Sequence, residues 1–403
     1  MKILNIVGSM DPELGGLAQM IRSVSAIHHE MGHEVDVLSL DAPDSGIPED
    51  AAFRLIAVGP GKYGWGYCKG LKSWLKAHLN EYDGVIMHGL WQYPSIAVAD
   101  VISELRRQEK ATPVFFAFPH GMLDPWFQSW KRRPLKTFRN LLYWHLFENR
   151  VIRSADTMLF TCLTEVRLGT KTFHRYRAKK NLAIPFGCTA PPPETEAMQI
   201  AFRNNCPNLE DAPYWLFISR IHPKKGVDLL VKAYCKKLQE SISSSLSFPH
   251  LVIAGPGLNT PYGRLITELA SSHPEHIHFP GMLTGDAKWG AFYGSCGFFL
   301  PSHQENFGIA VAEALGCGKR VYISNQVNIY EEISSCDAGI VADNNIKGTE
   351  LLIENALKDL PESDSEEYRM KSRRCFEQHF DIAKTAEKLI DLIQTHQASS
   401  DAY

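Results

Sequence analysis

The residues KILNIV (2–7) form a short apolar run, and the positions that follow, up to residue 40, decide the fold. After a glycine-containing loop, apolar residues recur every three or four positions from Leu17 to Ile27, and a second apolar run covers residues 35–40. The helical spacing predicts an amphipathic helix, and the two runs predict strands. The chain therefore opens with a β-α-β unit, the building block of a parallel sheet.

The same alternation continues through both halves of the chain. Further strands are predicted at residues 53–58, 84–87, 113–117, 157–161 and 181–184. A proline-rich stretch at 186–213 lacks a strand-like run, and a second series is predicted at 214–219, 250–254, 276–279, 297–300, 320–324 and 339–342. We therefore expect an α/β protein with two doubly wound, Rossmann-like lobes, residues 1–190 and 191–403, with the last helix a candidate to cross back to the first lobe.

The size and composition of the chain are typical of a globular protein with two domains. Its 403 residues exceed what one ordinary hydrophobic core organises. With a net charge of -3 it lacks the basic character that nucleic-acid binding usually leaves, so we expect no nucleic acid partner. The nine cysteines form no C-x-x-C pair, and the opening apolar run is too short for a secretory signal. These features predict a cytoplasmic protein.

The most informative stretch for function is SHQENFGIAVAEA (302–314), which follows the predicted strand at 297–300. It is a strand-loop-helix junction, and such junctions at the carboxyl ends of parallel strands bind ligands. Gly308 allows a close approach to the backbone amides at the start of the helix. Glu305 and Glu313 flank these amides, and carboxylates can accept paired hydrogen bonds from vicinal hydroxyls. The pattern favours a sugar site, although two surface glutamates on a solvated helix would give the same spacing.

A second junction, SRIHPKKG (219–226), places cations at the end of the first strand of the same lobe. Arg220 can hold phosphate oxygens with two hydrogen bonds, and Lys225 adds a point charge just before a helix. This arrangement suits the stabilisation of a departing diphosphate. The alternative interpretation is a solvated basic loop.

These motifs resemble those of the family 4 glycosyltransferases, which have the GT-B fold, and the resemblance extends over nearly the whole chain. The two glutamates correspond to the family's E-x7-E signature, and residues 219–226 resemble its (G/S)-R-x4-K-G motif. The resemblance implies that Glu305 contacts the donor sugar, that Glu313 contacts the ribose, and that Arg220 and Lys225 hold the diphosphate. The backbone amides that it implies for the diphosphate are those of Phe307, Gly308 and Ile309.

Two segments of the first lobe also resemble family motifs that lie close to the donor. The pair Gly15-Gly16 resembles a glycine loop that approaches the donor phosphate and the acceptor. PHGM (119–122) resembles the segment whose histidine lies beside the donor sugar, so His120 is the candidate catalytic histidine.

The remaining resemblances concern the acceptor and the nucleotide base. HGLW (88–91) is similar to an acceptor-side segment, which implies roles for His88 and Trp91. IAGPG (253–257) and PGM (280–282) resemble loops that line the base, which implies contacts from Gly255 and Met282. Residues 325–332 depart from the glycine-rich segment of many relatives, so no sugar contact is carried over there.

The resemblance implies a retaining glycosyltransferase that moves a hexose from a nucleotide diphosphate sugar to a glycan or lipid-linked glycan in exopolysaccharide or surface polysaccharide synthesis. The implied mechanism is a front-face attack after closure of the two lobes across a cleft. UDP-glucose is the first donor expected and GDP-mannose the second. No cofactor is expected, and the lack of a D-x-D triplet and of zinc-type clusters in the sequence predicts a metal-independent reaction.

Other functions fit parts of the sequence. GPGKYG (59–64) matches the G-x-G-x-x-G dinucleotide fingerprint, but the following strand ends in Met87-His88, where that fingerprint needs an acidic residue. We therefore reject a dinucleotide-binding oxidoreductase. A GT-B epimerase or hydrolase of nucleotide sugars, and a catalytically silent scaffold that binds a nucleotide or glycan, stay open as alternatives.

Residues 130–147 mix basic and aromatic side chains with an apolar, helix-like stretch. Such a segment can lie on an anionic membrane surface. It can also be an ordinary helix that packs on the first lobe. We favour the packing helix and keep peripheral contact with the inner face of the membrane as a second hypothesis.

Overall fold

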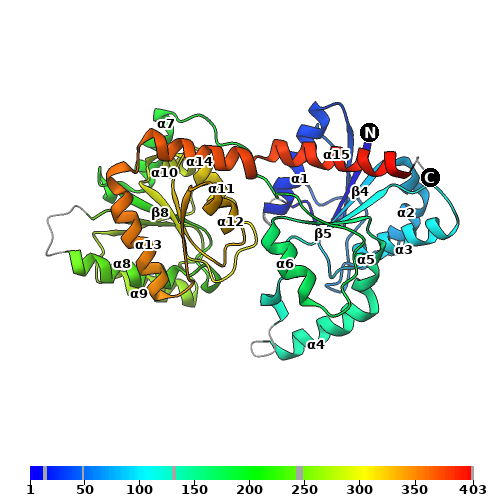
Figure 1. Ribbon diagram of the computed structural model, residues 1–403, viewed down its shortest axis with the longest axis horizontal. Coiled ribbons are helices and arrows are strands. Elements are labelled where there is room, and N and C mark those ends of the chain that lie inside the picture. Colours follow the sequence, from blue (N-terminus) through cyan, green and yellow to red (C-terminus); the bar gives the residue numbers. More distant parts are fainter. Residues whose placement is uncertain (12–15, 48–49, 129–132, 242–247, 401–403) are drawn as a thin grey trace. The chain divides into compact units, whose positions relative to one another are not determined.

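The computed structural model describes residues 1–11, 16–47, 50–128, 133–241 and 248–400 (Figure 1). The chain divides into two compact units. The first lobe consists of Met1–Gly187 together with Ile382–Tyr403, and the second lobe consists of Cys188–Asp381. The last helix of the chain therefore belongs to the first lobe.

The first lobe is built on a parallel sheet of seven strands in the order β3-β2-β1-β4-β5-β6-β7. Its central strands are almost wholly buried, as expected for continuous apolar runs in a parallel sheet. The strands are β1 (Lys2–Val7), β2 (Glu34–Ser39), β3 (Arg54–Ala57), β4 (Gly84–His88), β5 (Val114–Phe118), β6 (Thr157–Phe160) and β7 (Asn181–Ala183).

The helices of the first lobe pack in two groups, as a doubly wound sheet requires. Helix α1 packs against α15, while α3 packs against α2 and α5. These helices are α1 (Gly16–Glu30), α2 (Leu71–His78), α3 (Tyr93–Arg107), α4 (Pro134–Tyr143), α5 (Asn149–Ser154), α6 (Leu163–Thr172) and α15 (Ile382–Ser400). A π-helical turn, Trp144–Glu148, joins α4 to α5. None of the described helices is both long enough and apolar enough to span a membrane.

The second lobe repeats this plan with a parallel sheet of six strands in the order β10-β9-β8-β11-β12-β13. Its strands are β8 (Tyr214–Ile218), β9 (His250–Ala254), β10 (Ile277–Gly281), β11 (Gly297–Leu300), β12 (Val321–Ser324) and β13 (Gly339–Ala342). Its helices are α7 (Glu196–Asn205), α8 (Val227–Ser241), α9 (Pro261–Ala270), α10 (Gly285–Gly294), α11 (Ile309–Gly316), α12 (Tyr330–Ser335), α13 (Ile346–Asp359) and α14 (Glu366–His379).

In both sheets the chain starts with a central strand, adds strands on one side of it, and then returns to add strands on the other side. The strand order therefore reverses beside that first strand. Strand β1 lies between β2 and β4, and β8 lies between β9 and β11. The chain leaves these neighbouring strands in opposite directions, which opens a crevice at their carboxyl ends. The segments 88–91, 219–226 and 302–314 follow β4, β8 and β11. The topology therefore places the motifs found in the sequence at the two reversal points.

Helix α15 is attached to the first lobe by polar contacts with distant parts of the chain. The ring Nε2 of His28 donates a hydrogen bond to the carbonyl of Ala386 (3.0 Å), and the hydroxyl of Thr385 donates to the carbonyl of Pro185 (2.9 Å). A Cβ atom on Gly84 would lie 2.6 Å from the Cδ1 of Ile393, so a larger residue in β4 would displace this side chain of α15. The end of the chain thus contributes to the core of the first lobe.

Acidification is predicted to destabilise the first lobe through His28. Burial lowers the pKa of His28 from 6.5 to about 4. Below pH 6.5 the unfolded chain therefore binds a proton that the folded protein does not, so the free energy of unfolding falls as the pH drops toward 4. We expect a loss of about 2 kcal/mol between pH 7 and pH 5, measured as a fall in the thermal unfolding midpoint.

The matched variant is His28→Gln, whose amide can still donate to Ala386 but does not titrate. Its unfolding midpoint should fall less steeply over the same pH range. Parallel pH profiles for the variant and the wild type would contradict the assignment to His28.

Candidate functional site

The loops that follow β8 and β11 lie side by side in the second lobe. The amide of His303 donates to the carbonyl of Lys224 (2.8 Å). Gly226 has a φ of +66°, and a Cβ atom there would lie 2.1 Å from the carbonyl oxygen of Pro301. This contact requires a glycine at the end of the 219–226 motif. The structure therefore brings the two predicted motifs together.

The central interaction of this site is an ion pair between Lys225 and Glu305. The Nζ of Lys225 donates to the Oε2 of Glu305. Their side chains are 13% and 16% exposed, so the pair is partly withdrawn from water. Both residues were predicted to face the donor, and the structure shows that each already neutralises the charge of the other.

The backbone of Glu305 is held by the segment that departs from the family pattern. The amide of Glu305 donates to the carbonyl of Gln326 (2.9 Å), and the amide of Asn328 donates to the carbonyl of Glu305 (3.0 Å). The 325–332 segment thus has a structural role in fixing this carboxylate.

Gly308 begins helix α11 in a left-handed conformation, with a φ of +77°. Its carbonyl accepts the first hydrogen bond of the helix, from the amide of Val311 (2.8 Å). The amides of Ile309 and Ala310 precede that bond and have no partner within the helix. Phe307 is buried beside them. The turn therefore offers backbone donors to an anion.

Glu313 is paired with Lys288, a residue that sequence reasoning missed. The Nζ of Lys288, on α10, donates to the Oε1 of Glu313 (2.7 Å), and the two side chains are 24% and 15% exposed. The same ammonium group lies 4.2 Å from the ring centre of Trp289. Only the packing of α10 near α11 reveals this pair, because nothing in the spacing of the sequence points to it.

The 219–226 loop carries a positive potential. Arg220 is exposed at its start. Burial, and then the charges of Arg220, Lys224 and Lys225, lower the pKa of His222. Such a field favours an anionic ligand at this end of the sheet.

The two residues predicted to line the nucleotide base differ in their surroundings. Gly255 has a φ of +137°, and a Cβ atom there would lie 2.0 Å from the carbonyl oxygen of Ser219, so this glycine lets β9 approach the basic loop. The side chain of Met282 is exposed by 67%. Among the described residues, no group of three or more His, Cys, Asp or Glu side chains could hold a metal ion.

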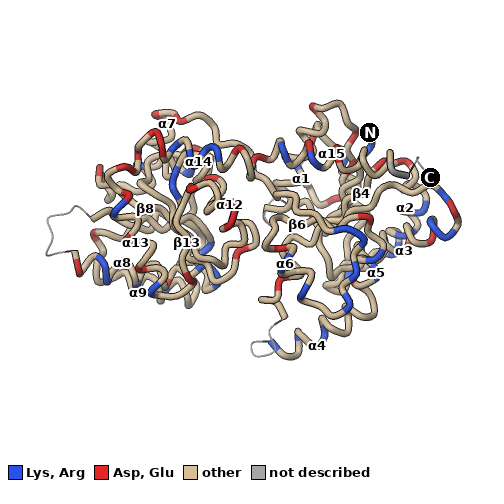
Figure 2. The backbone as a smooth tube through the Cα atoms, viewed as in Figure 1, with Lys and Arg blue, Asp and Glu red and all other residues tan. Residues whose placement is uncertain are grey.

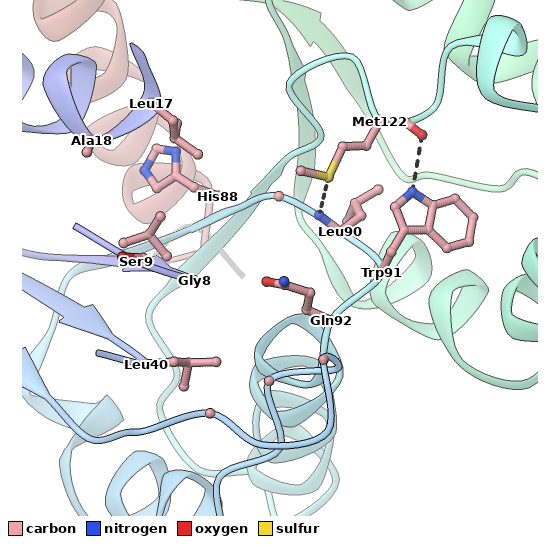
Figure 3. Close-up of a pocket in the computed structure, with 15 residues that line it drawn as sticks. Gly8, Ser9, Leu17, Ala18, Leu40, His88, Leu90, Trp91, Gln92 and Met122 are labelled. Atoms are coloured by element: carbon pink, nitrogen blue, oxygen red, sulfur yellow. Dashed lines mark hydrogen bonds between the residues drawn. The ribbon is translucent and has the colours of Figure 1, made fainter. Parts of the chain in front are cut away.

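The first lobe contains a cavity of about 690 Å³ at the carboxyl ends of β1 and β4 (Figure 3). Its wall combines the loop after β1, the start of α1, the 88–92 loop and residues of the 59–66 loop. The lining residues are Val7, Gly8, Ser9, Leu17, Ala18, Leu40, Gly61, Gly64, Gly66, His88, Gly89, Leu90, Trp91, Gln92 and Met122. The rejected dinucleotide fingerprint therefore forms one wall of this cavity, a role that sequence reasoning missed.

Helix α1 begins at Gly16, which is followed by the cavity residues Leu17 and Ala18. The predicted Gly15 lies outside the described residues. Trp91 has a φ of +67°, and its Nε1 donates to the carbonyl of Met122 (3.1 Å), as Figure 3 shows. That bond fixes the 88–92 loop against the PHGM segment.

His88 and His120 are hydrogen-bonded to each other. The Nδ1 of His88 lies 3.0 Å from the Nε2 of His120, and the rings stack with their centres 5.3 Å apart. The Nε2 of His88 lies 3.0 Å from the Oδ1 of Asn5, on β1. Both ring nitrogens of His88 are therefore engaged within the protein, one of them by the candidate catalytic histidine.

The direction of these hydrogen bonds follows from charge and chemistry. Burial lowers the pKa of His88 to about 3, and burial together with His88 lowers the pKa of His120, so both rings are neutral at pH 7. The Oδ1 of Asn5 accepts, which places the hydrogen of His88 on Nε2 and makes its Nδ1 an acceptor for His120. The Nδ1 of His120 is then a buried lone pair without a hydrogen-bond partner among the described residues.

A buried carboxylate holds the turn at His120 and Gly121, which have φ values of +51° and +82°. The Oε1 of Glu165 accepts the amide of Gly121 (2.5 Å), and its Oε2 accepts the amide of Thr161 (2.6 Å). Sequence reasoning missed this residue too, because it lies on α6, far from the motif it supports.

Two sequence models of known families match the chain. The model described as "Glycosyl transferase 4-like domain" matches residues 15–187, and the model described as "Glycosyl transferases group 1" matches residues 199–374. A D-inositol 3-phosphate glycosyltransferase from Rhodococcus opacus is 30% identical over 132 residues, which cover 32% of this chain and 29% of that protein. One from Kribbella flavida is 27% identical over 184 residues, which cover 44% of this chain and 42% of that protein. The matches thus span less than half of these relatives.

Solved structures resemble the chain over nearly its full length. A glycosyltransferase from Rickettsia africae has a TM-score of 0.75 at 14% identity and covers 98% of each chain. A sucrose-phosphate synthase from Thermosynechococcus elongatus has a TM-score of 0.72 at 18% identity and covers 99% of each chain. HepE from Anabaena, in complex with UDP and glucose, has a TM-score of 0.69 at 14% identity and covers 98% of this chain and 100% of that chain. At these identities the likeness establishes the fold.

The two parallel-sheet lobes, each with motifs at its reversal point, define a protein of the GT-B class. The family matches together extend over most of the chain, which belongs to the group 1, family 4 glycosyltransferases. The predicted fold and the predicted family are thereby confirmed.

The protonation states inferred for His88 and His120 can be tested by NMR. In nitrogen-15 NMR spectra, with His88→Asn and His120→Asn used for assignment, both rings should stay neutral from pH 8 to pH 5, because protonation would leave a charge buried. The Nδ1 of His120 should show the shift of a nitrogen without hydrogen. Titration of either ring near pH 6.5, or a hydrogen on that Nδ1, would show that the network is arranged differently.

Proposed function

We propose that this protein transfers a hexose from a nucleotide diphosphate sugar to a hydroxyl of a glycan or lipid-linked glycan, with retention of the anomeric configuration, in the synthesis of an exopolysaccharide or surface polysaccharide. The observation that carries the proposal is that the basic 219–226 loop lies against the loop after β11, with Lys225 paired to Glu305, at the reversal point of the second lobe. Helix α11, which follows, begins with amides that have no partner within the helix, and it carries Glu313. Cations and amides suit a diphosphate, and carboxylates suit the hydroxyls on either side of it.

In the proposed reaction the bond between the anomeric carbon and the diphosphate oxygen breaks, and its electron pair leaves with the diphosphate. The acceptor oxygen forms the new bond on the same face, and its proton passes to an oxygen of the leaving phosphate. Arg220, Lys225 and the amides around Gly308 stabilise the charge that develops on the diphosphate. Glu305 is proposed to orient the sugar, Glu313 to hold the ribose, and Gly255 and Met282 to contact the base.

The first lobe is proposed to supply the acceptor site and the reacting-face histidine. The Nδ1 of His120 accepts a hydrogen bond from a sugar hydroxyl, and the cavity beside His88 and Trp91 takes the acceptor. Its described lining contains no charged side chain, which suits a hydroxyl-bearing sugar. Closure of the lobes is proposed to bring the two half-sites together.

Neither a cofactor nor a metal is proposed for the reaction, since cations and amides of the chain can neutralise the leaving group. UDP-glucose is proposed as the first donor to test and GDP-mannose as the second; the Anabaena structure of the same fold holds UDP and glucose. A cytoplasmic location is proposed, and the nine cysteines, all free thiols, suit a reducing compartment.

Nucleotide binding tests the donor site. We expect UDP, GDP or ADP to bind in calorimetric titration without metal, and Glu313→Gln to weaken the preferred nucleotide about tenfold, because a charged acceptor of the ribose hydroxyls is lost. The matched control is Glu350→Gln, since Glu350 is also 15% exposed and also paired with a lysine, Lys236, at 2.8 Å. If none of the three nucleotides bound, a catalytically silent scaffold that binds a glycan would be the better hypothesis.

Turnover tests the role of Lys225. Lys225→Ala should lower kcat about 100-fold or more, because a cation at the developing diphosphate charge acts mainly in the transition state. The neighbouring Lys224→Ala is the control and should change kcat little. Equal losses in both variants would indicate a general effect of the basic loop.

The identity of the product separates transfer from the alternatives. Incubation of the bound sugar nucleotide with cell-derived glycans should give a glycoside that carries the new sugar in the retained configuration, read by NMR. Free sugar or an epimerised nucleotide sugar as the sole product would instead support the hydrolase or the epimerase.

A further inference from the structure

Helix α4 and the π-helical turn after it expose their apolar side and bury polar residues. Thr137 and Asn140 lie on the buried side of the helix, and Trp144 continues that side into the turn. The opposite side carries four large apolar residues with exposed fractions of 86, 63, 53 and 54%: Leu135, Phe138, Leu142 and Leu146. Their spacing of three and four residues places them in one stripe, which we call the α4 stripe. Helices of globular proteins usually turn such a stripe toward the core.

The helix cannot bury the α4 stripe by rotating, because its other side is fixed to the lobe. Trp144 is fully buried, stacks on Phe173 at 4.5 Å, and donates from Nε1 to the carbonyl of His174 (3.1 Å). Asn140 and Thr137, about one and two turns nearer the start of the chain on the same side, are 8% and 2% exposed. The apolar stripe is therefore held outward, and an exposed contiguous patch of this kind marks an interaction surface.

Basic side chains accompany the α4 stripe. Arg133, Lys136 and Arg139 occupy the first turns of α4, and the helix contains no acidic residue (Figure 2). No ion pair with a carboxylate of the described residues engages these three cations. The nearest acidic residues along the chain on either side, Asp124 and Glu148, are both buried, and Glu148 accepts the hydroxyl of Ser95 (3.2 Å). Residues 130–132 of the predicted segment 130–147 lie outside the described residues.

We propose that the α4 stripe docks on an anionic membrane surface. The four apolar side chains enter the boundary between headgroups and acyl chains, while the three cations contact lipid phosphates. The excess of positive charge favours anionic lipid over a second copy of this chain, whose α4 would repel it. The favoured expectation of an ordinary packing helix is thus half right: the helix packs on the lobe, but through its polar side and Trp144. This inference rests on the geometry of the first lobe and does not require the proposed transfer reaction.

Co-sedimentation of the full chain with lipid vesicles tests the proposal without any donor or acceptor. The wild type should bind vesicles of phosphatidylcholine with 30% phosphatidylglycerol, and binding should weaken as salt is raised. Phe138→Ser/Leu142→Ser should lower the partition coefficient about tenfold or more, because the inserted apolar area is lost. Lys136→Gln/Arg139→Gln should remove the preference for the anionic lipid.

The matched control is Leu265→Ser/Leu351→Ser, which replaces two exposed leucines of the second lobe, 44% and 46% accessible, and should bind vesicles like the wild type. Unchanged thermal unfolding midpoints would verify that the exposed substitutions leave the fold intact. The proposal is overturned if the wild type does not bind anionic vesicles, or if Phe138→Ser/Leu142→Ser binds them as well as Leu265→Ser/Leu351→Ser does. A dimer in sedimentation velocity that dissociates on Phe138→Ser/Leu142→Ser would assign the stripe to self-association instead.

Discussion

The reversal of strand order beside β1 and beside β8 is the constraint on which the rest of the structure depends. Where the chain leaves adjacent parallel strands in opposite directions, no crossover covers their carboxyl ends, and loop backbone can carry ligand-binding groups. The second lobe uses that opening for the basic loop and the start of α11. The first lobe uses it for a cavity lined by several loops and by the start of α1. The positions of both candidate sites therefore follow from the topology of the sheets, whatever side chains line them.

The two glutamates of the candidate site in the second lobe are each paired with a lysine in the structure. Lys225 is paired with Glu305 and Lys288 with Glu313, so neither carboxylate is left uncompensated in its partly buried position. In the proposed reaction, a diphosphate that binds Lys225 would release Glu305 from this pair and leave it free to accept hydroxyls of the sugar. No ion pair within the described part of the chain engages the exposed Arg220, so in the proposed reaction it can contact phosphate directly. The two ion pairs thus hold Lys225, Glu305, Lys288 and Glu313 in place.

The first lobe relies on neutral polar networks instead. Asn5, His88 and His120 form one hydrogen-bonded series from β1 to the loop after β5, and Glu165 fixes the left-handed turn that carries His120. Such buried series are rigid because every broken bond leaves a desolvated group. Helix α15 adds support to the same lobe through His28, whose burial makes that support sensitive to acid. The outward-facing stripe of α4 lies on this rigid lobe and can act without disturbing the networks.

The sequence by itself determined the fold class, the two sheets and the motifs at their ends, because strand and helix periodicities and glycine positions are local properties of the chain. The strand expected at residues 339–342, for example, is β13 (Gly339–Ala342). The glycine that ends the 219–226 motif is required by the structure, because a Cβ atom on Gly226 would clash with the carbonyl of Pro301. Lys288, Glu165 and Asn5 could not be predicted as parts of the sites, since each acts on a residue at least 25 positions away through packing of separate elements. The same holds for α4: its sequence shows an apolar stripe, but only the burial of Trp144 on the lobe decided that the stripe faces outward.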